Sequence, residues 1–190
     1  MPRSRTLQRQ SLACAALAAG LLVLGTALAP APASAVTVSF DPLHGYFVNN
    51  DTLTVDVTVD AVADLRGFTF VFEFNPTIVR PVTVKAGPLV TGAACPNFFT
   101  WINSGAIGDS IDVDAALLGC SVAGPGRIIR TRWVGVSPGI SPLRCRANRG
   151  AMRNSNNTPI PFSCDDGTIQ YERPVEVEPI HWSRAKGLYR

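Results

Sequence analysis

Residues 68–74 read Phe-Thr-Phe-Val-Phe-Glu-Phe, and the turn pair Asn75-Pro76 ends this alternation of aromatic and other side chains. Successive side chains of a β-strand point to opposite faces, so the four phenylalanines share one face of a predicted strand. Residues 53–60 show the same period of two, with Thr and Asp on the polar side. One sheet alone cannot bury a face of four phenylalanines, so we expect a second sheet to cover it.

Further short apolar segments follow, and Gly, Pro, Asn and Asp separate them at short intervals. No segment after residue 35 has a useful apolar stripe of helical period. Many short strands with turn signals are typical of a β-sandwich or jelly roll. The other candidate strands are 82–84, 98–102, 110–114, 127–134, 143–146, 160–163 and 168–171.

The N-terminal segment, residues 1–35, has three arginines in its first nine positions, an apolar run over 12–29, and then Pro-Ala-Pro and Ala-Ser-Ala. This order is typical of a secretory signal peptide. We expect cleavage between Ala35 and Val36, export, and no membrane span after cleavage. The alternative is an uncleaved anchor, because the run is almost long enough to span a bilayer. The alanine-rich composition is typical of bacterial signals.

The overall charge depends on this segment. The 190 residues carry 17 basic and 14 acidic side chains, but residues 36–190 carry 14 of each. A neutral chain of this length predicts one domain and no nucleic-acid binding. Apolar residues make up 46% and charged residues 16%, which excludes a disordered, highly charged chain.

The four cysteines that remain after cleavage are Cys95, Cys120, Cys145 and Cys164. An even number of cysteines in an exported chain predicts disulfides. We expect Cys95–Cys120 and Cys145–Cys164, because each pair closes a short loop between neighbouring candidate strands. A zinc site is disfavoured, since the chain has no C-x-x-C motif and few histidines.

Charge is distributed unevenly along the predicted domain. Residues 36–125 have a net charge of −6 and residues 126–190 of +6, and 127–153 hold seven arginines without an acid. One interpretation is a basic face for an acidic partner such as an anionic polysaccharide, with Arg130 and Arg132 as candidate binding residues. The favoured interpretation is that strands of the two parts are neighbours, so that their charges neutralise each other.

Catalytic motifs are missing from the sequence. It has no G-x-S-x-G elbow, P-loop or G-x-G-x-x-G, so we expect a non-enzyme without a cofactor. Asp109, Asp112 and Asp114 are the densest group of acids and have oxygen ligands suited to Ca²⁺. Their spacing lacks the central Gly and closing Glu of an EF-hand, so a solvated strand edge is favoured over calcium.

The order of these motifs resembles a known family. Residues 51–57 (Asp-Thr-Leu-Thr-Val-Asp-Val) and 65–76, with Gly67 opening the phenylalanine strand and Asn75-Pro76 closing it, are similar to the opening strands of a cohesin domain. The Gly-x-Leu end of 78–89 and the strand 126–133 continue the likeness. Its closing hairpin is matched by 141–143, 156–160 and 166–169.

The resemblance implies an all-β, two-layer antiparallel sandwich of jelly-roll topology with about nine strands, related to carbohydrate-binding modules. It implies a non-catalytic role in extracellular polysaccharide degradation, with a dockerin-type protein module or a polysaccharide as partner. Many cohesins carry Asp or Asn at a dockerin-contacting position that Thr69 occupies here. For sugar rings, Trp101, Trp133 and Tyr46 are candidate contacts, although the core is the favoured location for each.

The likeness covers the predicted sandwich over 36–172, which the signal peptide over 1–35 precedes and a linker and tail over 173–190 follow. The tail joins a Pro/Glu/Val spacer to a short basic, aromatic end at 181–190. That end is either a sorting or anchoring signal or a terminal helix. An anchoring tail would favour the second hypothesis, a structural subunit or adhesin of the cell surface.

Overall fold

The structure is a computed structural model, and it describes residues 35–48, 51–105 and 107–173. Residues 1–34 of the predicted signal peptide and the tail beyond Arg173 lie outside these residues, whereas the predicted sandwich lies almost wholly within them. Among the described residues, no helix is long and apolar enough to cross a membrane.

Twelve strands and two short helical turns make up the described part of the chain. In order they are β1 (Val36–Asp41), β2 (His44–Val48), β3 (Thr52–Val59), β4 (Gly67–Glu73), β5 (Val79–Ala86), α2 (Pro88–Thr91), β6 (Asn97–Ser104), β7 (Ser110–Leu117), β8 (Gly126–Gly135), β9 (Gly139–Cys145), the 3₁₀ turn η1 (Ala147–Arg149), β10 (Ala151–Arg153), β11 (Phe162–Cys164) and β12 (Gly167–Glu172).

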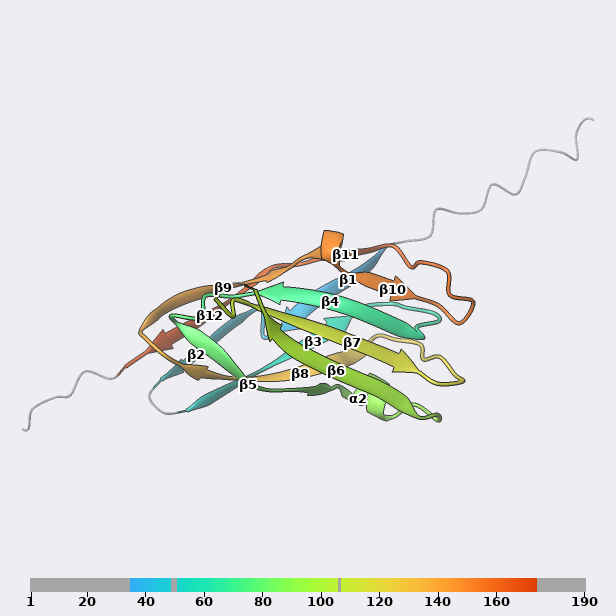
Figure 1. The fold of residues 1–190 in the computed structure, drawn as a ribbon, viewed down its shortest axis with the longest axis horizontal. Coiled ribbons are helices and arrows are strands. Elements are labelled where there is room, and N and C mark those ends of the chain that lie inside the picture. The colour runs from blue at the N-terminus through green and yellow to red at the C-terminus, as the bar shows by residue number, and fades with distance from the viewer. Residues whose placement is uncertain (1–34, 49–50, 106, 174–190) are drawn as a thin grey trace, which may run out of the picture. The chain divides into compact units, whose positions relative to one another are not determined.

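These strands form two sheets. The five-stranded sheet has the order β11-β1-β3-β8-β5, and the seven-stranded sheet has the order β2-β12-β9-β4-β7-β6, with β10 paired to β4. In Figure 1 the strands β4, β7 and β6 cross in front of β3 and β8, which belong to the other layer. The predicted all-β, two-layer sandwich is therefore confirmed.

The core between the sheets follows from the alternation in β4. Phe68, Phe70, Phe72 and Phe74 are at most 5% exposed and pack with inward-facing residues of β1, β3 and β8. Val71 points away from them but is also buried, and the backbone N–H of Arg146, in the segment that follows β9, donates to the Val71 carbonyl. The pattern that predicts the strand thus also fixes which sheet face is covered.

The strand count and the strand directions differ from the prediction. Twelve strands replace about nine, and the additional ones are β1, β2 and β10. Two pairs, β1 with β11 and β2 with β12, are parallel rather than antiparallel. Each parallel pair joins the start of the domain to its end, and the intervening chain supplies the long connection that parallel pairing requires.

Both disulfides join the pairs that the sequence predicts. Cys95 and Cys120 have Cα atoms 5.9 Å apart, and Cys145 and Cys164 have Cα atoms 5.7 Å apart. The second disulfide links β9 of one sheet to β11 of the other, so it crosslinks the two layers covalently.

Candidate binding surface

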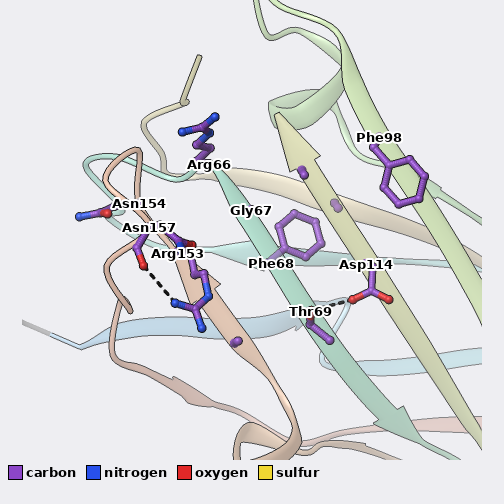
Figure 2. Close-up of a pocket in the computed structure, with 12 residues that line it drawn as sticks. Arg66, Gly67, Phe68, Thr69, Phe98, Asp114, Arg153, Asn154 and Asn157 are labelled. Carbon is purple, nitrogen blue, oxygen red and sulfur yellow. Dashed lines mark hydrogen bonds between the residues drawn. The ribbon is translucent and has the colours of Figure 1, made fainter. Parts of the chain in front are cut away.

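The outer face of the seven-stranded sheet carries a shallow groove, which Figure 2 shows between β10 and β6. Cross-strand registers place Arg153, Gly67, Ala116 and Phe98 in one row over β10, β4, β7 and β6. The two residues in the middle of the row, Gly67 and Ala116, have the smallest side chains, a hydrogen atom and a methyl group. The row is therefore a trough with a cation at one end and an aromatic ring at the other.

The size of this groove matches an element of secondary structure. Its volume is about 540 Å³. Arg153 and Phe98 are three strand spacings apart, which is about 14 Å. An α-helix with its side chains is about 10–12 Å across. The trough is thus wide enough for one helix lying on the sheet.

Exposed apolar side chains flank the groove on the β6 side. Phe98 is 55% exposed and Ile102 is 59% exposed, both on the outer face of the edge strand β6. Phe99 and Trp101 alternate with them and pack against the core. β6 therefore has apolar residues on both faces. The inner ones pack on the core, and the outer ones leave exposed apolar surface that a partner can cover.

Thr69 lies in the next row of the same face, beside Asp114. The Thr69 hydroxyl donates a hydrogen bond to Oδ1 of Asp114, with an oxygen–oxygen distance of 2.6 Å. Figure 2 shows this pair at one end of the groove. Thr69 therefore lies on the same surface as Phe98, and the carboxylate next to it comes from the neighbouring strand β7.

The other wall of the groove is the loop over residues 154–157, which two arginines hold in place. Arg66 Nη1 donates to the Ser155 carbonyl at 2.9 Å, and Arg153 Nη1 donates to the Asn157 carbonyl at 3.0 Å. Asp64 also accepts from the Ser155 hydroxyl. Hydrogen bonds from the hydroxyls of Ser121 and Ser155 lower the pKa of the Asp64 carboxyl.

The two tryptophans are not on this surface: their role as candidate sugar contacts needs correction, whereas the favoured core location holds for both. Trp133 is 2% exposed and lies in the core, where Nε1 donates to the Thr131 hydroxyl at 2.7 Å and the ring meets Phe74 edge-on. Trp101 is half-buried on the inner side of β6. Neither ring is available as a platform for a sugar, whereas Tyr46 is 55% exposed at the distant edge strand β2.

Arg130 and Arg132 lie on the other sheet, on exposed positions of β8. The structure therefore does not bring them together with Thr69. Arg130 pairs with Asp56 of β3, so charges of the acidic and basic parts of the chain do meet. Every ion pair in the described residues joins an acid from 36–125 to an arginine from 126–190.

The three aspartates considered for calcium do not converge. Asp114 accepts from Thr69, whereas Asp112 faces Arg149, with an oxygen–nitrogen distance of 3.9 Å. Among the described residues, no group of three His, Cys, Asp or Glu side chains could hold a metal ion. Asp114 is also the only carboxylate lining the groove, whose lining includes no His or Cys. This surface offers packing and hydrogen bonds.

Comparisons with solved structures identify proteins that share this two-layer β-sandwich fold. A non-cellulosomal cohesin from the hyperthermophilic archaeon Archaeoglobus fulgidus superposes with a TM-score of 0.59 at 11% identity, over 83% of this chain and 99% of that one. A chain of a type I cohesin–dockerin complex from Clostridium thermocellum gives 0.61 at 17% identity, over 73% and 100%.

The domain has a cohesin-like fold. A cohesin module of a family 33 glycoside hydrolase from Clostridium perfringens agrees, with a TM-score of 0.58 at 6% identity, over 74% of this chain and 97% of that one. No protein-family model matches the sequence, and no curated protein matches it. The likeness of the cohesin-like domain to these proteins is therefore one of fold.

Of the residues on this surface the sequence interpretation named only Thr69 as a binding residue, and it missed the row from Arg153 to Phe98 and the carboxylate of Asp114. The adjacent pair Phe98-Phe99 is a usable signal, because two consecutive aromatic residues in a strand must point to opposite faces. For Asp114 the sequence offers a calcium ligand or a solvated strand edge, and its partner Thr69 follows from the strand register, which the sequence does not show.

Proposed function

We propose that the cohesin-like domain is an exported, non-catalytic protein-binding module that receives a dockerin-type helical module on the outer face of β4, β7 and β6. The single observation that carries this proposal is the row Arg153–Gly67–Ala116–Phe98. It combines a helix-sized trough with an exposed aromatic side chain. Large apolar side chains in a well-fitted pocket supply most of the energy at protein interfaces.

The solved neighbours support the choice of partner. Several of them are cohesin chains in complexes with dockerins, including one from Clostridium thermocellum and one from Acetivibrio cellulolyticus. Export is supported by the two disulfides, because such crosslinks persist in oxidising compartments. A place in extracellular polysaccharide degradation belongs to the same proposal.

A binding titration tests this function. A panel of purified dockerin modules is titrated calorimetrically against the chain, and we expect at least one to bind. Phe98→Ser removes the aromatic side chain, and we expect roughly 30-fold weaker binding, the loss typical of one central apolar contact. Ala116→Arg fills the floor of the trough and is expected to abolish binding.

The matched control is Arg132→Ser, an exposed residue of the opposite sheet, which is expected to leave dockerin affinity unchanged. Absence of binding to every dockerin would refute the dockerin partner. Equal losses for Phe98→Ser and Arg132→Ser would refute the location of the site. Circular dichroism of each variant excludes misfolding as the cause.

A further inference from the structure

The outer face of the five-stranded sheet contains a neutral network of two acids and two arginines. Arg127 Nε lies 3.1 Å from Asp56 Oδ2, and Arg130 Nε lies 2.8 Å from Asp56 Oδ1. Arg127 also reaches Asp41, with Nη2 3.3 Å from Oδ2. Asp56 is only 5% exposed beneath these side chains. The two acids on this face are thus already paired.

Three further cations on this face have no carboxylate partner. Lys85, Arg132 and Arg80 are exposed on β5 and β8, and none lies within 4.0 Å of a carboxylate in the described part of the chain. Lys85 is directly opposite Arg130 in the register, so both point to the same side of the sheet. Like charges in such a pair destabilise a sheet.

The charge on this face is therefore polarised. The acids are on β1 and β3, and the unpaired cations are on β8 and β5. Overall, residues 36–173 carry eleven basic and twelve acidic side chains. The net charge of these residues is slightly negative, so the domain as a whole does not attract anions. An anion would be attracted to this face by the unpaired cations on β8 and β5.

Hydroxyl groups accompany these cations. Arg132 has Thr54 of β3 on one side and Thr83 of β5 on the other in the same cross-strand row. Arg130 is already paired with Asp56, so the free cations nearest to each other are Lys85 and Arg132, which are diagonal neighbours on β5 and β8, about 7–8 Å apart. Free cations at this spacing between hydroxyls suit a linear polymer that carries anionic groups and hydroxyls along its length.

We infer that the face of β8 and β5 binds an anionic polysaccharide, with Lys85, Arg132 and Arg80 contacting its carboxylate or sulfate groups. This site is on the sheet opposite the groove, so it is independent of the proposed function. A dockerin-type partner and a polysaccharide could then occupy the domain together.

The test measures binding of the chain without residues 1–35 to polygalacturonate, which carries carboxylates, and to heparin, which carries sulfates. Affinity electrophoresis at about 20 mM and about 200 mM salt reports the electrostatic contribution. We expect retention at low salt by at least one of the two polymers. The double variant Lys85→Glu/Arg132→Glu is expected to weaken it by more than about tenfold.

A matched double variant, Arg144→Glu/Arg149→Glu, makes the same change in net charge at exposed positions on the side of the seven-stranded sheet, and should retain binding. Equal weakening of both variants would overturn the proposal, because it would show an effect of net charge alone. Failure to bind either polysaccharide at low salt would also overturn it, as would binding only to duplex DNA or to anionic lipid vesicles. Urea unfolding of each variant confirms that the fold is intact.

Discussion

Arg130 of β8 donates two hydrogen bonds to the carboxylate of Asp56 on β3, with Nε 2.8 Å from Oδ1 and Nη2 3.0 Å from Oδ2. These bonds raise the pKa of the Arg130 guanidinium. The two residues are partners in the antiparallel register, so the contact lies across the centre of the five-stranded sheet. It joins the acidic and the arginine-rich parts of the chain.

Replacing Asp56 by Asn should lower the free energy of unfolding by about 2 kcal/mol, because a buried carboxylate that pairs with two arginines becomes a neutral amide. The half-exposed arginines keep the loss below that of a fully buried pair. Urea unfolding at pH 7 measures it. Asp51→Asn is the control, since Asp51 is exposed and forms no ion pair in the described residues, and a change within about 0.5 kcal/mol is expected there. Equal effects of the two substitutions would contradict this role of Asp56.

Acid should destabilise the domain partly through Glu73. Its carboxylate accepts a hydrogen bond from Arg146, which lowers the pKa of Glu73. The pKa in the unfolded chain is about 4.3. The stabilisation is therefore complete above that pH and is lost as the pH falls through the lower folded pKa. Urea midpoints between pH 7 and about pH 2.5 should decline less for Glu73→Gln than for the wild type. A residual decline is expected, because the pKa of Asp64 is also lowered.

Trp133 should contribute to stability and not to ligand binding. Trp133→Ala removes the side chain from the core, and a loss of about 3–5 kcal/mol is expected. Phe98→Ala, the matched aromatic substitution at an exposed position, should change stability by no more than about 0.5 kcal/mol. Thermal and urea unfolding provide the measurement. A stable Trp133→Ala variant with impaired binding would show that the ring has a surface role.

Removal of the disulfide between the sheets should be costly. Cys145 and Cys164 are 19 residues apart, and a crosslink that closes a loop of this length stabilises by about 3 kcal/mol. The double variant Cys145→Ser/Cys164→Ser should therefore unfold at lower urea. Peptide mapping without reduction should recover the linked Cys145 and Cys164 peptides. A peptide that joins Cys95 to Cys145 would contradict the pairing.

Local patterns were sufficient to predict the main strands and the core. The alternation over residues 68–74 specifies both a strand and its buried face, so Phe70 and Phe72 could be placed in the core from the sequence alone. The same counting applied to β8 also excludes Trp133 from the surface. Arg130 and Arg132 point outwards, so Trp133 must share the inward side with Thr131.

Other features depend on partners that are distant in the chain. β2 has β12 as its partner, and β1, which pairs with β3, has β11 as its second neighbour. Both β11 and β12 are more than 100 residues away from these partners in the chain. The trough depends on the registers of β10, β4, β7 and β6 together. Gly67 and Ala116 form its floor only because these registers place Arg153 on one side of them and Phe98 on the other. A single sequence contains no record of such registers.

The two parallel pairs have a consequence for biosynthesis. β1 is an edge strand until β11 is made, and β2 has no partner in its sheet until β12 is made. A ribosome delivers the chain from its N-terminus, so the five-stranded sheet cannot be completed before Cys164 has emerged, nor the seven-stranded sheet before Glu172. Nascent chains therefore hold open strand edges through most of synthesis, and these edges can pair with other chains. Chaperone retention up to the last strand would protect such a chain, and a product that ends before β11 should aggregate.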